Sequence, residues 1–208
     1  DMVSRGLGDV YKRQILNGEE IIFIFAKHYL YEKKIKKGSV LVTNEVANHG
    51  LDIALKKLGL KLKRVKVGDK NILKEILVNK YFFGGEPSGH FIFKDDILIG
   101  DGMATAIRLL TLILNEKKKL SELRNGIDLL EVLNINQKID RERFYLNQES
   151  IYKKLNNLLK NLDIYYNIRP SGTEPLLRVN LQYHKRNIKV INLNRLKKQI
   201  IKVISDAC

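Results

Sequence analysis

Two kinds of segment alternate between residues 15 and 117, and this alternation limits the fold more than any other feature. Apolar runs rich in β-branched residues predict short buried strands at 39–43, at 61–67 and on both sides of 84–90. Segments with apolar residues at helical spacing lie at 21–34, 47–58, 70–80 and 102–115. This order predicts an α/β domain in which helices cover both faces of a mixed sheet.

Two aspartates stand where helices are expected to start. Asp69 precedes the segment 70–80, and Asp101 precedes the segment 102–115. An aspartate just before a helix accepts hydrogen bonds from the first free backbone N–H groups. Both residues are therefore predicted to be helix N-caps.

The order of segments changes after residue 117. Residues 118–126 are charged and interrupted, which predicts a linker between two domains. Beyond it, strands are expected at 132–139, 164–168 and 176–182, and helices at 148–162 and 193–206. Residues 127–208 are therefore expected to form a second, smaller α+β domain with an antiparallel sheet.

The first fourteen residues differ in style from the rest of the chain. DMVSRGLGDVYKRQ contains arginine and glycine but no isoleucine or asparagine, whereas lysine, isoleucine, asparagine and leucine dominate afterwards. The segment resembles a translated sequencing adapter; the alternative is a native loop with a short helix. We leave residues 1–14 out of the fold prediction.

The chain carries a formal net charge of +15, from 38 basic against 23 acidic residues. Such an excess is found in proteins that bind nucleic acid or anionic membranes. Here the basic residues are spread along the chain, and no aromatic signature of an RNA-binding module accompanies them. We interpret the charge as compositional and expect neither a nucleic-acid nor a membrane partner.

The cell compartment is predicted from three simple features. The longest apolar stretches, 21–26 and 109–114, are too short to cross a bilayer. No charged-then-apolar leader opens the sequence. The single cysteine, Cys208, has no partner for an internal disulfide. We expect a cytoplasmic protein.

The strongest chemical motif is RPSGTEP at 169–175, between two expected strands. The Arg169 guanidinium is a planar fork of donors that fits phosphate oxygens, and the hydroxyls of Ser171 and Thr173 can add neutral hydrogen bonds. Gly172 allows backbone N–H groups to approach a ligand closely. The motif predicts a phosphate clamp, with an ordinary Pro/Gly hairpin turn as the alternative.

A second polar loop, GGEPSGH at 84–90, lies between apolar strands. The Glu86 carboxylate can accept paired hydrogen bonds from neighbouring sugar hydroxyls, Ser88 can give or take one more, and His90 can contact a hydroxyl or a phosphate. These residues predict a sugar-binding loop. The alternative is a tight turn with a solvated Glu86 and a His90 that is satisfied by backbone groups.

The two loops together resemble the sugar-binding and phosphate-binding loops of the α-D-phosphohexomutases. Residues 67–70 (VGDK), with Asp69 and Lys70 as possible accessory residues, also resemble this family. The resemblance covers residues 15–206 and implies the family's third and fourth domains. The Gly-Asp-basic form of 68–70 is closer to phosphoglucosamine mutases than to phosphomannomutase/phosphoglucomutase members, which remain the alternative.

This resemblance implies that the full-length enzyme interconverts glucosamine 6-phosphate and glucosamine 1-phosphate through a bisphosphate, using a phosphoserine and Mg²⁺. The family carries the serine in its first domain and a DGDGDR-type magnesium loop in its second, and neither is in these 208 residues. The chain is expected to hold no catalytic residue and no metal ligand, and to be inactive without the N-terminal domains. The resemblance assigns the sugar to Glu86, Ser88 and His90 and the phosphate to Arg169, Ser171, Gly172 and Thr173.

A non-catalytic basic module that binds nucleic acid or phosphorylated ligands is the alternative of another class. Such a module would carry aromatic stacking platforms and no sugar-reading carboxylate. The carboxylate of Glu86 would repel a polyanion and so counts against this alternative.

Overall fold

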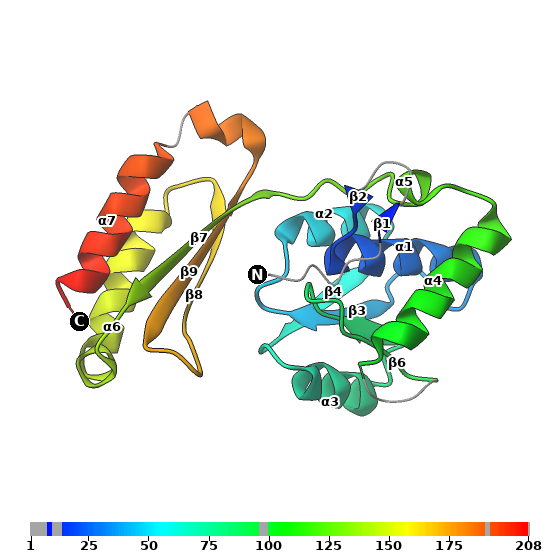
Figure 1. Ribbon diagram of the computed structural model, residues 1–208, viewed down its shortest axis with the longest axis horizontal. Coiled ribbons are helices and arrows are strands. Elements are labelled where there is room, and N and C mark those ends of the chain that lie inside the picture. Colours follow the sequence, from blue (N-terminus) through cyan, green and yellow to red (C-terminus); the bar gives the residue numbers. More distant parts are fainter. Residues whose placement is uncertain (1–7, 10–13, 96–99, 190–191, 208) are drawn as a thin grey trace. The chain divides into compact units, whose positions relative to one another are not determined.

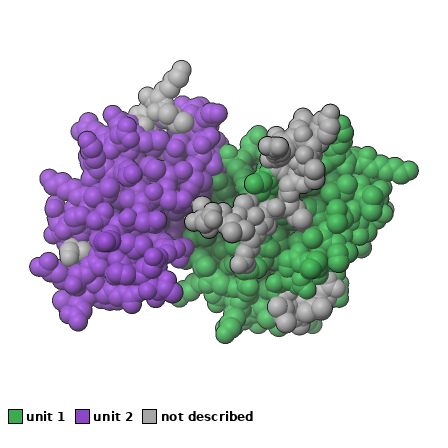
Figure 2. Space-filling model, viewed as in Figure 1, with its two compact units in different colours: residues 1–129 green, residues 130–208 purple. Residues whose placement is uncertain are grey.

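The structure is a computed structural model that describes residues 8–9, 14–95, 100–189 and 192–207. The chain divides into two compact units, residues 1–129 and 130–208, which Figure 2 colours separately. The two units have separate sheets and separate hydrophobic cores. The interpretation of residues 1–14 lies largely outside the described residues, which include only Gly8, Asp9 and Gln14 of that segment.

Unit 1 follows the expected alternation of strands and helices (Figure 1). Its elements are β1 (Gly8–Asp9), β2 (Gln14–Ile15), α1 (Gly18–Tyr31), β3 (Val40–Asn44), α2 (His49–Lys57), β4 (Lys61–Val65), α3 (Asp69–Asn79), β5 (Phe83–Gly85), β6 (Phe91–Phe93), α4 (Gly102–Glu116) and α5 (Leu120–Leu123). The larger sheet has the order β4-β3-β5-β6. Strand β3 is parallel to β4 and β5, and β5 is antiparallel to β6. The prediction of a mixed sheet is confirmed.

Helices cover both faces of this sheet, as the central strand β3 shows. Successive residues of a strand point to opposite faces. Leu41 packs into the larger core with residues of α1 and α2, whereas the next residue, Val42, clusters with Ile72 and Ile76 of α3. Both strand residues are fully buried, as expected for a strand covered on both sides.

One of the two predicted N-caps is confirmed and the other is wrong. Asp101 caps α4, because its Oδ1 accepts from two backbone N–H groups of the helix at 2.8 and 3.1 Å. Asp69 is instead the first residue of α3; Gly68 is the N-cap, and no side chain caps this start. Gly68 has a φ of +120°, which glycine adopts without steric cost. The Asp69 carboxylate is thereby free to contact other side chains.

Residues 118–126, expected to be a linker, contain the short helix α5. Leu120 and Leu123 are buried in the core of unit 1, whereas residues 117–119 are exposed. The charged surface of this stretch therefore hides an apolar contact. The compact unit continues to Leu129, beyond the expected domain end at 117.

Unit 2 has the expected α+β architecture. Its elements are β7 (Glu131–Lys138), α6 (Arg141–Leu159), β8 (Ile164–Pro170), β9 (Leu176–Tyr183), the 3₁₀ turn η1 (Lys185–Lys189) and α7 (Leu193–Ser205). The sheet order is β7-β9-β8, with antiparallel neighbours throughout. Residues of α6 and α7 share one core with Val179 and Leu181 of the central strand. None of the helices within the described residues is long and apolar enough to cross a membrane.

Candidate functional site

The GGEPSGH loop closes the hairpin between β5 and β6 in unit 1. The N–H of Glu86 donates to the carbonyl of His90 (2.9 Å), and the N–H of Gly89 donates to the carbonyl of Glu86 (3.0 Å). Gly89 has a φ of +93°, a left-handed conformation that favours glycine. The hydroxyl of Thr43, on β3, donates to the Gly85 carbonyl at 2.8 Å. These bonds fix the loop to the sheet.

The start of α1 lies against the same loop. The N–H of Gly18 donates to the Pro87 carbonyl at 3.2 Å. A Cβ at Gly18 would lie 2.2 Å from the Glu86 carbonyl oxygen, closer than any real contact. Glycine is therefore required here, because any side chain would push α1 and the loop apart.

Glu86 is buried, with 6% of its surface exposed. Its Oε1 accepts hydrogen bonds from Asn44 Nδ2 (3.0 Å) and from the backbone N–H of Gly68 (2.9 Å). Its Oε2 accepts from the Ser88 hydroxyl at 3.2 Å. The donors come from β3, from the turn before α3 and from the loop itself. This burial is incompatible with a solvated turn residue.

The hydrogen bonds keep Glu86 ionised. Burial acts to raise the pKa of Glu86, but the bonds from Asn44, Gly68 and Ser88, together with the side-chain contact with Asp69, outweigh it and hold the pKa below its usual value. A carboxylate oxygen can accept two hydrogen bonds. Oε1 already has two donors and Oε2 has one, so Oε2 is the atom that retains acceptor capacity.

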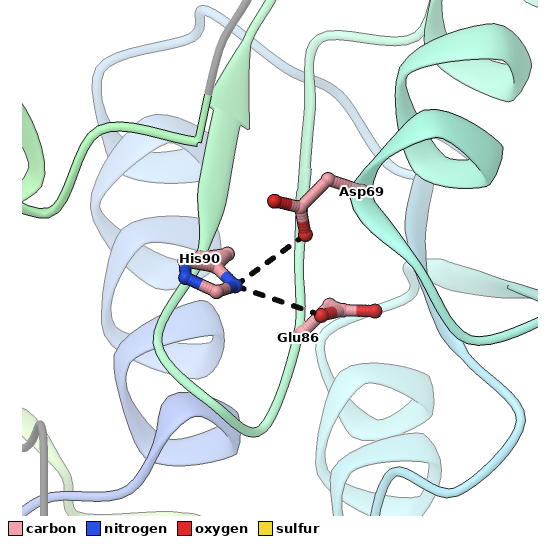
Figure 3. A group of neighbouring side chains, drawn as sticks. All are labelled: Asp69, Glu86 and His90. Atoms are coloured by element: carbon pink, nitrogen blue, oxygen red, sulfur yellow. Dashed lines mark ion pairs between the residues drawn. The ribbon is translucent and has the colours of Figure 1, made fainter. Parts of the chain in front are cut away.

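Asp69 and His90 lie beside Glu86, and Figure 3 shows the three side chains turned towards one another. His90 Nδ1 lies 3.5 Å from Asp69 Oδ1, 3.8 Å from Glu86 Oε2 and 3.5 Å from Ser88 Oγ. Burial raises the pKa of Asp69; His90 opposes this, and the Glu86 carboxylate adds to it. Lys70, the other accessory candidate, is exposed on α3.

The cluster of Asp69, Glu86 and His90 offers three potential ligand atoms within 4.8 Å of one another. The magnesium that the family resemblance implies prefers six oxygen ligands, mostly carboxylates and water. Here one of the three atoms is an imidazole nitrogen, and Glu86 Oε1 is taken by two N–H donors. The cluster does not fit such a magnesium site, and we assign no metal to it.

The RPSGTEP loop closes the hairpin between β8 and β9 in unit 2. Ser171 is buried; its N–H donates to the Leu176 carbonyl (2.8 Å), and its hydroxyl accepts from the Glu174 N–H (3.3 Å). Gly172 and Thr173 are exposed. The loop is therefore tied down at Ser171 and open at its tip. It has the shape of a hairpin turn, and this shape also leaves the backbone N–H groups of the tip accessible to an anion.

Arg169 is half-buried near the end of β8, directly opposite Arg178 on β9. Arg178 forms a 2.6 Å ion pair with Glu174. Within the part of the chain that the structure describes, the Arg169 guanidinium has no hydrogen bond or ion pair. The Glu174 carboxylate offsets the charge of Arg178, so Arg169 is the cation of this strand pair that a bound anion would neutralise.

Two further residues, which the sequence analysis does not single out, are Asn44, which donates to Glu86, and Arg178, which pairs with Glu174 of the RPSGTEP loop. Asn44 directly follows the apolar run 39–43, at the carboxyl end of a parallel strand, where ligand-binding residues of α/β sheets gather. That position was a usable signal. Arg178 offered none, because its place opposite Arg169 depends on the strand register.

The sequence matches known proteins along most of its length. Residues 17–129 match the family model of the phosphoglucomutase/phosphomannomutase α/β/α domain III. The chain is 40% identical over 175 residues to a phosphoglucosamine mutase of Clostridium botulinum (strain Hall). The aligned region covers 82% of this chain and 39% of that protein. It is 38% identical over 198 residues to a phosphoglucosamine mutase of Ruminiclostridium cellulolyticum, and this aligned region covers 91% of this chain and 42% of that protein. The chain thus spans about two fifths of the length of these curated relatives.

Solved structures share the fold at low sequence identity. An N-acetylglucosamine-phosphate mutase of the α-D-phosphohexomutase superfamily, in its substrate complex, superposes with a TM-score of 0.75 at 17% identity, over 96% of this chain and 46% of that one. A phosphoglucomutase/phosphomannomutase family protein from Burkholderia thailandensis superposes with a TM-score of 0.72 at 20% identity, over 98% of this chain and 45% of that one. These structures share the fold, and the matched domain and the curated relatives show that the chain belongs to the phosphoglucomutase/phosphomannomutase family of α-D-phosphohexomutases, as its C-terminal part.

Proposed function

We propose that the chain is the phosphosugar-binding part of a phosphoglucosamine mutase, an isomerase that interconverts glucosamine 6-phosphate and glucosamine 1-phosphate through a bisphosphate. Both curated relatives described above carry that name. The observation that carries the proposal is the buried, ionised Glu86, which three donors orient and whose Oε2 still has acceptor capacity. Recognition of sugar hydroxyls requires such a fixed acceptor.

In unit 1, Glu86 accepts hydrogen bonds from sugar hydroxyls through Oε2. Ser88, which bonds to the same oxygen, gives or takes one further bond to the sugar. His90 contacts a hydroxyl or a phosphate, in an orientation that Asp69 and Glu86 favour. The sugar-binding set is therefore Glu86, Ser88 and His90, with Asp69 as a positioning residue.

In unit 2, the phosphate-binding set is Arg169, Ser171, Gly172 and Thr173. Arg169 supplies the positive charge and a planar pair of donors. The Ser171 hydroxyl accepts from a backbone N–H and so keeps its own proton to donate. A bisphosphate intermediate must bind in two orientations, so this clamp receives either phosphate of the sugar.

The chain supplies binding and not the transfer itself. A phosphoserine and a DGDGDR-type magnesium loop would come from the N-terminal domains of the full-length enzyme, and neither motif is present in this sequence. Magnesium would neutralise charge on the transferred phosphoryl group. We expect no turnover from the 208-residue chain alone.

The test uses a chimera in which the N-terminal part of the C. botulinum relative precedes residues 17–208 of this chain. We expect the chimera to turn over glucosamine 6-phosphate and the 208-residue chain to be inactive. A folded chimera without turnover, beside an active parent enzyme, would contradict the proposal. Turnover by the 208-residue chain alone would contradict the assignment of the transfer step to the missing domains.

Phosphomannomutase/phosphoglucomutase activity is the second candidate, because the matched domain carries that description. The ratio of kcat/KM values of the chimera for glucosamine 6-phosphate, mannose 6-phosphate and glucose 6-phosphate separates the two. A preference for glucosamine 6-phosphate supports the first proposal, and a preference for either neutral sugar supports the second.

A further inference from the structure

Helix α4, the long green helix in Figure 1, is apolar on two sides. Its inner side is formed by Thr105, Leu109 and Leu112, which are buried in unit 1. On its outer side, four large apolar residues are 73, 58, 56 and 73% exposed: Met103, Ile107, Leu110 and Leu114. Their spacing of four, three and four residues places them on one face of the helix. We call these four residues the α4 stripe.

An apolar row of this kind is unusual on a free surface. Single exposed apolar residues are common, but a contiguous row marks a contact surface. A helix that is apolar all round belongs in the interior of a larger protein. No charge interrupts the row, because the guanidinium of Arg108 turns away from it and lies 4.6 Å from the centroid of the Phe93 ring.

We propose that the α4 stripe packs against the N-terminal part of the full-length enzyme. The inference rests on the proposed function in one respect only, that the chain is part of a longer family member. Matched relatives and solved chains are covered to 39–46% of their length, so more than half of such a polypeptide lies outside this chain. A covalently linked partner is present at high effective concentration, so even a small apolar surface suffices to hold it.

A second copy of the chain fits this surface less well. Each chain carries a formal net charge of +15, and like charge opposes self-association. The stripe itself offers no acidic side chain that would offset this repulsion. The surface that covers it should therefore belong to a different part of the enzyme and should be apolar and uncharged.

The test measures the accessibility of one thiol. In a Cys208→Ser background, Leu110→Cys places a single cysteine on the stripe, and Val78→Cys places one on α3 as the control, since Val78 is also exposed (70%). The chimera is built with its other cysteines replaced. We expect maleimide to react with Leu110→Cys at least about tenfold more slowly in the chimera than in the 208-residue chain, because labelling requires access to the thiol. Val78→Cys should react equally in both.

Each other outcome overturns the inference. Equal rates for Leu110→Cys in chain and chimera would show that nothing covers the stripe. Slow labelling of the 208-residue chain that depends on concentration would assign the stripe to a second copy. Slow labelling of that chain at every concentration would show that the chain covers the stripe by itself.

The outcome is independent of catalysis. Turnover is measured separately on the unlabelled chimera. Protection of Leu110→Cys in an inactive chimera would support this inference and contradict the proposed function. An active chimera with an unprotected cysteine would do the reverse.

Discussion

Replacing Glu86 by glutamine keeps the shape of the side chain and removes its charge. With its amide oxygen in the place of Oε1, glutamine retains the hydrogen bonds from Asn44 and Gly68. Its NH₂ group then stands in the place of Oε2, where the Ser88 hydroxyl must accept instead of donating. The hydrogen bonds from Asn44 and Gly68 are therefore kept but are no longer made to a charged group. The acceptor oxygen Oε2, which we assign to the sugar, is lost.

The size of each effect follows from these contacts. A hydrogen bond to a charged group contributes about 1.5–3 kcal/mol and a neutral one about 1 kcal/mol. Weakening two bonds by about 0.5–1 kcal/mol each lowers the free energy of unfolding by about 1–2 kcal/mol. Loss of the sugar contact costs about 1.5–3 kcal/mol in the transition state, or roughly 10- to 150-fold in kcat/KM.

The pH dependence gives an independent check of the charge. The pKa of Glu86 is lowered in the fold, so its contribution to stability is present above the unfolded value near 4.5 and is lost as the pH falls through the folded pKa. Glu86→Gln should remove this acid-sensitive contribution. The difference in melting temperature between the unsubstituted chimera and its Glu86→Gln variant should therefore shrink as the pH is lowered.

Both measurements are made on the chimera, as kcat/KM for glucosamine 6-phosphate and as a thermal melt. Glu75→Gln is the matched control, because Glu75 also accepts an amide hydrogen bond, from Asn79 at 3.0 Å, but on exposed α3 surface. The control should change neither quantity. Normal kcat/KM in folded Glu86→Gln would remove Glu86 from the sugar site. An unchanged melting temperature at neutral pH would refute the stabilising role of its charge.

Three further predictions concern other parts of the molecule. Arg169→Ala should weaken phosphosugar binding to the chimera by about 1.5–3 kcal/mol in calorimetry. Arg195→Ala on α7 is the control and should have no effect. Unchanged affinity of the Arg169→Ala variant would place the phosphate clamp elsewhere. Asp69→Asn should raise the melting temperature at neutral pH, because the raised pKa of Asp69 shows that the fold disfavours its ionised form. The gain in melting temperature should vanish below about pH 3.8, where the carboxyl is protonated in both folded and unfolded states. A lower melting temperature at about pH 7 would contradict this prediction. Leu109→Ala should lower the free energy of unfolding of the 208-residue chain in urea by about 2–5 kcal/mol, and Leu110→Ala by less than about 0.5 kcal/mol. Equal losses for the two variants would contradict the orientation of α4.

The secondary structure was largely predictable because its signals are local. The strands around GGEPSGH and the cap at Asp101 depend on neighbouring residues alone, and both predictions are confirmed. Helix α6 starts at Arg141 instead of 148, because Asp140 caps it by accepting from the Arg143 N–H at 2.9 Å. Asp140 is thus a local signal for the earlier start.

Other differences arise from packing and backbone conformation, which the sequence does not display. Asp69 is not a cap because the φ of Gly68 moves the helix start by one residue. The segment 118–126 looks like a linker by its charges, but Leu120 and Leu123 are buried by contacts with residues far away in the chain. Such contacts have no local signature.

The candidate site shows the same division. Polar side chains on a glycine-rich loop between apolar strands were enough to single out Glu86, Ser88 and His90, whose ligand roles stay predictions. The environment that makes Glu86 an acceptor was not predictable, since Asn44 and Gly68 lie 42 and 18 residues away in the sequence. Their approach depends on the pairing of β3 with β5 and on the turn before α3.

The way Glu86 is stabilised bears directly on the chemistry that we propose. A lysine or arginine beside a buried carboxylate would neutralise it and occupy its oxygens. Within the described residues, Glu86 is held instead by three neutral donors, and its ion-pair partner is His90 at 3.8 Å. Neutral donors keep the carboxylate ionised while leaving Oε2 with acceptor capacity, which hydroxyl recognition needs and which a salt bridge would remove. The Arg169 guanidinium lies in the other unit, near the end of β8 and next to the exposed tip of the RPSGTEP loop. The roles that we propose therefore agree with the charges, a buried carboxylate in unit 1 for hydroxyls and a guanidinium in unit 2 for phosphate.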